Sequence, residues 1–201
     1  MTHCFSRRSF LKGSAAAAAA LTSPLLPADA ASSETENGLF SPVSAFCQTQ
    51  YGPVKGREGE NGQLCWYGIP YGAAPTGESR WTAPQEPACW HTVRDCTSPA
   101  PAAYQYTTFP LGTEDCLTLD IYSSAEAKKR PVLVYLHGSA ATGSSLELPG
   151  SELVRDAGCV FVALNYRLGL FGWNCLPALT ADPDATGNFA LLDIARALDW
   201  V

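Results

Sequence analysis

Two short apolar runs, 132–136 and 159–164, constrain most strongly the fold that this chain can adopt. Neither run contains a charged residue or an alternating polar face, which is typical of strands buried on both sides of a sheet. The stretch between them is long enough for a helical crossover, so we expect parallel neighbouring strands with a helix on one face. A third short strand is expected at 118–122. The pattern predicts an α/β fold.

Two helices are predicted near these strands. The first starts at Ser151 and ends at Gly158, and the second starts at Asn188 and runs to Val201. The residues expected to share one inner face are Leu153, Val154 and Ala157 in the first helix, and Leu191, Leu192, Ala195 and Leu198 in the second. Two strands that are apolar on both faces need more helical cover than this. We therefore expect the sheet to be incomplete.

An N-terminal β-hairpin is predicted from two earlier segments, 46–54 and 64–67. The Asn-Gly pair at 61–62 lies between them and favours a tight hairpin turn. Cys47 and Cys65 fall on opposite arms, which makes them candidates for a disulfide bridge.

The first apolar run ends abruptly in small residues. His137 is followed by Gly138, Ser139, Ala140 and Ala141, whose side chains are small enough to let a ligand approach the backbone N–H groups. An oxyanion hole needs such an arrangement, because preorganised N–H donors must point at the charge that develops on a carbonyl oxygen. The alternative is a strand-to-loop turn that binds no ligand.

The first thirty residues have the pattern of an export signal. Residues 6–12 read Ser-Arg-Arg-Ser-Phe-Leu-Lys, an alanine-rich stretch covers 13–21, and 28–30 form a small-x-small cleavage site. This pattern resembles the bacterial twin-arginine signal, whose partner is the twin-arginine export machinery. The apolar stretch is too short for a membrane anchor. We expect a signal at 1–30, a flexible lead-in at 31–45, one domain at 46–201, and a periplasmic or secreted protein.

The net charge bears on the partners of the chain, and the cysteine count bears on its disulfide bridges. The chain has a net charge of −6, and loss of the signal removes three positive charges and one negative charge, which gives −8. An acidic chain of this kind gives no support to nucleic-acid binding or to binding at an anionic membrane. Seven of the eight cysteines remain after Cys4 is removed. In an oxidising compartment some of them are expected to pair, and the odd count leaves at least one without an intramolecular partner.

We expect neither a metal nor another cofactor. No Cys/His spacing predicts a zinc site. The segment 182–193 matches part of an EF-hand loop, but Thr186 replaces an acidic ligand and Asp193 replaces the bidentate Glu. We favour a helix lead-in capped by Asn188 instead.

Several motifs, taken together, resemble the type-B carboxylesterases, the cholinesterase-like branch of the α/β-hydrolases. The resemblance covers about residues 46–201 in the order found in the family. The matching segments are Gly68-Ile69-Pro70-Tyr71-Gly72, Arg80-Trp81, Glu114-Asp115-Cys116-Leu117-Thr118-Leu119-Asp120, His137-Gly138, Asn165-Tyr166-Arg167-Leu168-Gly169, and Gly187-Asn188 with Leu191-Leu192-Asp193. The resemblance implies the N-terminal part of an α/β-hydrolase sheet.

The resemblance also implies ester hydrolysis by a Ser-Glu/Asp-His triad. The oxyanion donors of the family correspond to the backbone N–H groups of Ser139 and Ala140, where the family has glycines. No Gly-x-Ser-x-Gly nucleophile motif occurs in the 201 residues. No catalytic triad residue is therefore assigned within this chain, and His137 is expected to be structural.

Two further pairings follow from the resemblance. Arg80, Glu114 and Arg167 correspond to positions that form structural ion pairs, and we expect Arg80 to meet Glu114. In the family, Cys116 is bridged to a cysteine at a position that Ala103 occupies here. Cys96 or Cys89 is the candidate substitute, and Cys96–Cys116 is the pairing that we expect.

The sequence thus leads to one functional hypothesis with two alternatives. The first is a serine carboxylic ester hydrolase, truncated here before its nucleophile. The alternatives are a non-catalytic, cholinesterase-like binding protein and an inactive fragment.

Overall fold

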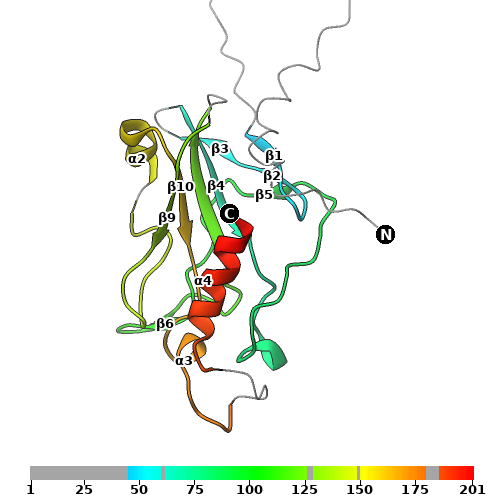
Figure 1. Cartoon of the computed structure of the whole chain (residues 1–201), viewed down its shortest axis with the longest axis vertical. Coiled ribbons are helices and arrows are strands. Elements are labelled where there is room, and N and C mark those ends of the chain that lie inside the picture. The colour runs from blue at the N-terminus through cyan, green and yellow to red at the C-terminus, as the bar shows by residue number, and fades with distance from the viewer. Residues whose placement is uncertain (1–44, 60–61, 126–128, 149, 180–185) are drawn as a thin grey trace, which may run out of the picture.

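The centre of the structure, a computed structural model, is a five-stranded mixed sheet (Figure 1). The structure describes residues 45–59, 62–125, 129–148, 150–179 and 186–201. The sheet has the order β3-β4-β8-β10-β9, in which β9 and β10 are parallel and the other neighbours are antiparallel. Its strands are β3 (Arg57–Glu58), β4 (Gln63–Pro70), β8 (Thr118–Ser124), β9 (Val132–Leu136) and β10 (Val160–Leu164). The predicted α/β fold, the parallel pair and the strand at 118–122 are confirmed.

The two faces of the sheet carry separate hydrophobic clusters. Helix α2 (Gly150–Ala157) packs through Val154 against Tyr122 and Phe161. Helix α4 (Phe189–Trp200) belongs to the larger cluster on the other face, which includes Leu119 and Val162. Alternate strand residues serve opposite faces because successive side chains of a strand point in opposite directions. The predicted crossover helix between β9 and β10 is thus confirmed, with Gly158 ending it at φ 62°.

The prediction that both apolar strands are buried on both faces is correct for β10 and wrong for β9. Every residue of β10 is buried. In β9, Val132, Leu133 and Leu136 are 42%, 45% and 45% exposed. The reason is position, because β9 is the last strand of the described sheet and pairs with β10 alone. A short apolar run does not reveal whether its strand lies at an edge.

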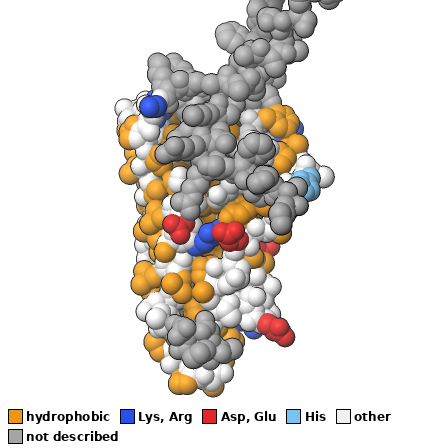
Figure 2. All heavy atoms as spheres, turned by 45° about the vertical axis from the view of Figure 1, so that its right-hand side comes forward, with side chains coloured by type: hydrophobic (Ala, Val, Ile, Leu, Met, Phe, Trp, Pro, Cys, Tyr) orange, Lys and Arg blue, Asp and Glu red, His pale blue; other side chains and the backbone are white. Residues whose placement is uncertain are grey.

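The inner face predicted for the second helix is also wrong. Leu191, Leu192 and Leu198 are exposed. Hydrophobic side chains likewise reach the surface along much of the described part of the face drawn in Figure 2. The residues of α4 that are buried are Phe189, Ala190, Asp193, Ala197 and Trp200. The helix is rotated away from its leucines because the side chain that it buries at its centre is Asp193.

In the first helix, the inward residues are only partly as predicted. Val154 is buried and Leu153 is half-buried, but Ala157 is exposed. The helix begins at Gly150, one residue before the expected cap. An added Cβ at Gly150 would overlap the rings of Phe161 and Tyr122. This close approach explains why a glycine stands at the start of the helix.

The N-terminal hairpin is displaced from its predicted position. Residues 46–54 do not form one strand, because β1 (Phe46–Gln48) and β2 (Pro53–Lys55) fold back on each other. Thr49 Oγ1 stabilises the turn by accepting from the N–H groups of Tyr51 and Gly52 at 3.2 and 3.1 Å. Strand β5 (Arg94–Asp95) joins β2 in this second sheet. The Tyr-Gly-Pro sequence at 51–53 was the sign of a turn that the prediction missed.

The hairpin across residues 59–62 exists between β3 and β4, with Arg57 opposite Cys65. Gly62 has a φ of 72°, as a tight turn requires, whereas Asn61 lies outside the described residues. Cys47 lies in the small sheet and Cys65 in the central sheet, and both are buried free thiols. The candidate Cys47–Cys65 bridge was therefore wrong.

The remaining elements are short and border the lower end of the sheet in Figure 1. They are the 3-10 helix η2 (Gly77–Ser79), strands β6 (Gln105–Tyr106) and β7 (Pro110–Leu111), and helix α3 (Gly169–Gly172). None of the helices in the described ranges has the length and apolar character needed to span a bilayer.

The register of β9 and β10 provides a matched pair for testing the edge position of β9. Leu164 is fully buried and lies opposite Leu136, which is 45% exposed. We expect Leu164→Ala to lower the free energy of unfolding by about 2–5 kcal/mol. Leu136→Ala should change it by about 0.5 kcal/mol or less. Urea unfolding followed by circular dichroism measures both; equal losses would contradict the assignment of β9 to the edge.

Candidate functional site

The candidate site is the loop at 138–145, which begins directly after β9 and His137. Gly138, Ser139, Ala140 and Ala141 are exposed, whereas His137 and Ser145 are buried at the two ends of the loop. An added Cβ at Gly138 would meet no atom within 4 Å, so there is open space beside the first residue of the loop. The loop therefore has a fixed base and an accessible middle.

Ser139 carries the unusual backbone conformation of the loop. Its φ is 73°, which makes it the one non-glycine residue with positive φ in the described ranges. This region costs an L-residue about 1–2 kcal/mol. The hydroxyl offsets part of the cost, because its Oγ accepts from the N–H groups of Ala141 and Thr142 at 3.1 and 3.3 Å. The conformation suits glycine, and serine retains it through these two hydrogen bonds.

The N–H groups of Ser139 and Ala140 have no acceptor among the described residues. The neighbouring donor, Ala141 N–H, is occupied by Ser139 Oγ. The carbonyl of Ala140 accepts from Gly169 N–H at 2.7 Å, which ties the loop to the first residue of α3. Two adjacent donors are thus left available in an exposed loop whose backbone is held from the other side. This is the arrangement that an oxyanion hole requires of its backbone.

His137 supports the base of the loop. It is 3% exposed, and its ring stacks on Tyr166 with centroids 4.3 Å apart and an interplanar angle of 4°. The hydroxyl of Tyr166 donates to the carbonyl of His137 at 2.6 Å. Burial lowers the pKa of the imidazole. A neutral, stacked and buried ring of this kind agrees with a structural role.

A buried polar network holds the far end of the loop. Ser145 Oγ donates to Asp120 Oδ2 at 2.7 Å, and Ser145 N–H donates to Asn165 Oδ1 at 2.9 Å. The other oxygen of Asp120 accepts from Gly68 N–H at 2.8 Å. Burial raises the pKa of the Asp120 carboxyl, although both hydrogen bonds oppose this rise. The network joins the loop to β8 and to the residue that follows β10.

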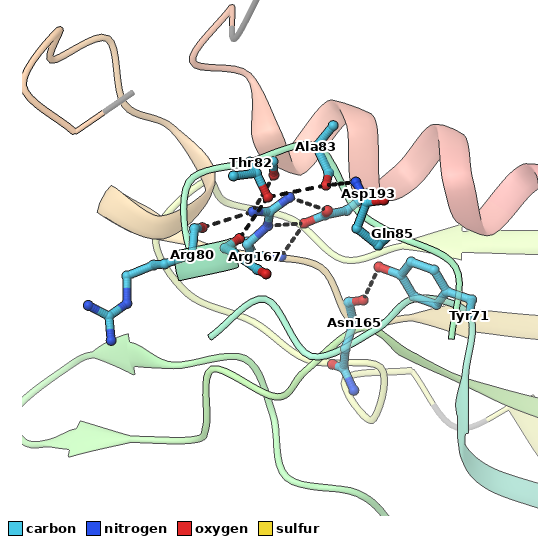
Figure 3. A network of polar contacts seen from close by, with 9 residues as sticks. Tyr71, Arg80, Thr82, Ala83, Gln85, Asn165, Arg167 and Asp193 are labelled. Atoms are coloured by element: carbon cyan, nitrogen blue, oxygen red, sulfur yellow. Dashed lines mark hydrogen bonds and ion pairs between the residues drawn. The ribbon is translucent and has the colours of Figure 1, made fainter. Parts of the chain in front are cut away.

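Two arginines connect the segment around residue 80 to the rest of the chain, and Figure 3 shows the contacts of one of them, Arg167. Arg80 forms the expected ion pair with Glu114 through two contacts of 2.5 and 2.8 Å. Arg167 pairs with Asp193 of α4 in the same bidentate manner, at 2.8 and 2.7 Å, and both side chains are buried. Arg167 Nη1 also donates to the carbonyls of Arg80 and Thr82. One guanidinium therefore holds helix α4 and the 80–82 segment together.

The expected Cys96–Cys116 disulfide is not formed. Both residues are buried free thiols. Burial raises the pKa of Cys96 to about 11 and that of Cys116 further still. Ala103, at the position of the family's second cysteine, is fully buried. Cys96 and Cys116 are thus thiols of the core, and they do not form the disulfide bridge that we expected from the resemblance.

The metal pattern at 182–193 is only partly within the described residues, because 182–185 lie outside them. Both carboxylate oxygens of Asp193 bind Arg167. Among the described residues, no cluster of three His, Cys, Asp or Glu side chains is suited to a metal ion. The predicted helix start at Asn188 agrees with the N-cap position of α4, but the Asn188 side chain makes no capping hydrogen bond.

Sequence reasoning missed three residues that hold the site in place. Gln105 binds Gly143 in the loop, Asp120 binds Ser145, and Asp193 is the partner of Arg167. For Asp193 a signal existed, since an acidic residue among the apolar positions of a helix needs a buried partner. Gln105 belongs to the short strand β6, and nothing in the sequence around it indicates a contact 38 residues away.

The conformation of Ser139 predicts that glycine is tolerated better than alanine at this position, the reverse of the usual order. Ser139→Ala keeps the positive φ and loses two hydrogen bonds, so the free energy of unfolding should fall by about 1–2 kcal/mol. Ser139→Gly loses the same bonds but removes the strain, so the free energy of unfolding should fall less than in Ser139→Ala. Ser144 is the control, because its hydroxyl accepts from Leu146 N–H at ordinary φ. At Ser144, the Gly variant should be less stable than the Ala variant. If Gly and Ala rank in the same order of stability at positions 139 and 144, the strained conformation of Ser139 is contradicted.

The buried ion pair predicts a large effect of removing Asp193. Asp193→Ala leaves the Arg167 guanidinium buried without its counter-charge and should cost about 3–5 kcal/mol in urea unfolding. The control is Asp156→Ala, which breaks the exposed pair with Arg155 on α2 and should have no measurable effect. Comparable losses in the two variants would show that Asp193 is not the partner on which Arg167 depends.

Comparisons with known proteins agree with this geometry. The carboxylesterase family matches residues 43–201, and the twin-arginine translocation signal matches residues 4–24. The protein is accordingly exported across the membrane, to the periplasm or beyond.

Relatives share about a third of their length with this chain. Para-nitrobenzyl esterase of Bacillus subtilis (strain 168) is 39% identical over 165 residues, which are 76% of this chain and 33% of that protein. Fumonisin B1 esterase of Sphingopyxis macrogoltabida is 36% identical over 166 residues, with 76% and 30% covered. A solved PNB esterase superposes with a TM-score of 0.72 at 39% identity, covering 79% and 34%. The chain therefore belongs to the carboxylesterase family, of the type-B branch, and its sheet is part of an α/β-hydrolase fold.

Proposed function

We propose that this chain is the N-terminal part of an exported serine hydrolase that cleaves carboxylic esters. In this proposal, the N–H groups of Ser139 and Ala140 form the oxyanion hole. The observation that carries it is the state of the loop, in which two adjacent exposed residues have N–H groups without an acceptor among the described residues, while the flanking backbone is bonded. Family membership supplies the reaction class.

The chemistry assigns a limited role to these residues. A nucleophile adds to the ester carbonyl, and the oxygen of that carbonyl gains negative charge as the tetrahedral intermediate forms. N–H donors that are already fixed stabilise this charge without reorganising, and each donor contributes a factor of about 10²–10³ in kcat. The Gly-x-Ser-x-Gly motif is absent from these 201 residues. We place the serine, the acid and the histidine on polypeptide beyond Val201.

One sequence departure favours a second candidate. Ser139 and Ala140 stand where the family has glycines, and Ser139 holds its φ of 73° at a cost in strain. A family member that had lost catalysis would be free to accumulate such changes. The second candidate is a non-catalytic, cholinesterase-like binding protein or an inactive fragment.

The test compares the 201-residue chain with the protein expressed from the gene together with its downstream coding sequence. Hydrolysis of a nitrophenyl ester should be absent from the 201-residue chain and present in the extended protein. An extended protein without turnover, or without a Gly-x-Ser-x-Gly serine, would reject the hydrolase and favour the second candidate. Triad-type turnover by the 201 residues alone would show that the nucleophile has been misplaced.

The oxyanion role is tested separately in the active, extended protein. An amide-to-ester replacement at Ala140, in which lactic acid takes the place of alanine, removes the N–H donor and leaves the side chain unchanged. It should lower kcat by about 10²–10³-fold with little change in KM. The same replacement at Ala74, an exposed alanine outside the loop, is the control. Equal effects at the two positions would contradict the assignment of Ala140.

A further inference from the structure

The side chain of Gln105 makes a two-point contact with the 138–145 loop. Its Nε2 donates to the carbonyl of Gly143 at 2.8 Å, and its Oε1 accepts from Gly143 N–H at 2.9 Å. A further bond from Nε2 reaches the carbonyl of Ala103 at 3.1 Å. Gln105 belongs to β6 and is buried. A primary amide thus satisfies both backbone groups of one loop residue.

A contact at Gly143 can restrict the conformation of the 138–145 loop. Its φ is 135°, a conformation that favours glycine, and an added Cβ would overlap the Nδ1 atom of His137. Gly143 is therefore packed against the residue that begins the loop, while its backbone is held by Gln105. The carbonyl of Ala140 is held independently by Gly169. Ser139 and Ala140 lie between His137 and Gly143, so the position of Gly143 limits where their N–H groups point.

We propose that Gln105 is a positioning residue, which fixes Gly143 and thereby sets the direction of the Ser139 and Ala140 N–H groups. This inference rests on the proposed function, because it concerns the loop to which the oxyanion role is assigned. The amide is suited to the task, since it presents one donor and one acceptor side by side. Alanine presents neither, and a carboxylate presents acceptors only.

Gln105→Glu separates this role from simple core filling. The neutral carboxyl has a donor and an acceptor, as the amide has, whereas the ionised form places a negative charge against the Gly143 carbonyl. Burial should raise the pKa of the introduced carboxyl. The loop should therefore be held at low pH and released as the pH rises through that pKa. The titratable groups beside Gly143 are His137 and Glu147, and the unsubstituted chain measured at the same pH values accounts for them.

The measurement is ¹H–¹⁵N NMR of the full chain at about pH 5 and pH 8, with amide exchange corrected for its intrinsic pH dependence. In Gln105→Glu, the exchange protection of Gly143 at low pH should stay close to that of the unsubstituted chain. At high pH the carboxylate repels the Gly143 carbonyl and should move away from Gly143, so the protection should fall about tenfold, as expected for losing a net hydrogen-bond contribution. The Ser139 and Ala140 signals should shift in parallel. Gln105→Ala should lose protection at both pH values.

The matched control is Gln85→Glu. Gln85 is an exposed glutamine whose Nε2 donates to the carbonyl of Ala83 at 3.0 Å, and among the described residues its side chain makes no hydrogen bond to the loop, so the loop signals should be unchanged at either pH. Near-UV circular dichroism reports the fold of each variant. If Gln105→Ala does not fold, the two pH values still compare one Gln105→Glu protein with itself.

Two results would overturn the positioning role. One is a Gly143 amide in Gln105→Glu whose protection is independent of pH. The other is a Gly143 response without any change at Ser139 and Ala140, which would make Gln105 a local structural residue only. Neither readout needs ester hydrolysis. An inactive extended protein with a pH-dependent loop would reject the proposed function and leave the positioning role standing.

Discussion

The buried ion pair between Arg167 and Asp193 is the interaction on which the arrangement of the chain depends. Arg167 follows β10 closely, and its guanidinium reaches α4 through Asp193 and the 80–82 segment through two carbonyls. Both charges are withdrawn from water, so either one alone would be strongly unfavourable. The pair therefore fixes the orientation of α4, whose leucines remain outside. It also fixes the backbone directly before α3, whose first residue, Gly169, donates its N–H to the carbonyl of Ala140.

Most of the fold was predictable because it follows local rules. The short apolar runs and the helix end at Gly158 identify the strands β8, β9 and β10 and the helix between β9 and β10. The errors concern properties that are not local. The exposure of β9 depends on which strand lies beside it, and the inner face of α4 depends on a charge partner 26 residues away. The missed turn at 49–52 is different, since its Gly-Pro signal was present in the sequence.

The sequence predicted the exposed loop of the site but not the residues that hold the loop in place. Small residues after His137 indicated the loop, and the resemblance indicated Ser139 and Ala140 as donors. The groups that hold the loop come from distant segments, through Gln105, Asp120 and Gly169. Tertiary contacts of this kind leave no periodic pattern in the sequence. The disulfide was predicted from the family and is absent between Cys96 and Cys116, because a resemblance in motifs does not preserve every side chain.

The central claim is that the Ser139 and Ala140 N–H groups are held in place but have no acceptor within the part of the chain that the structure describes. Residue-resolved amide hydrogen exchange on the unsubstituted full chain tests it most directly. The account predicts fast exchange at Ser139 and Ala140, and slower exchange at Gly143 and Ser145, whose N–H groups donate to Gln105 and Asn165. Protection of Ser139 and Ala140 equal to that of Gly143 and Ser145 would contradict it.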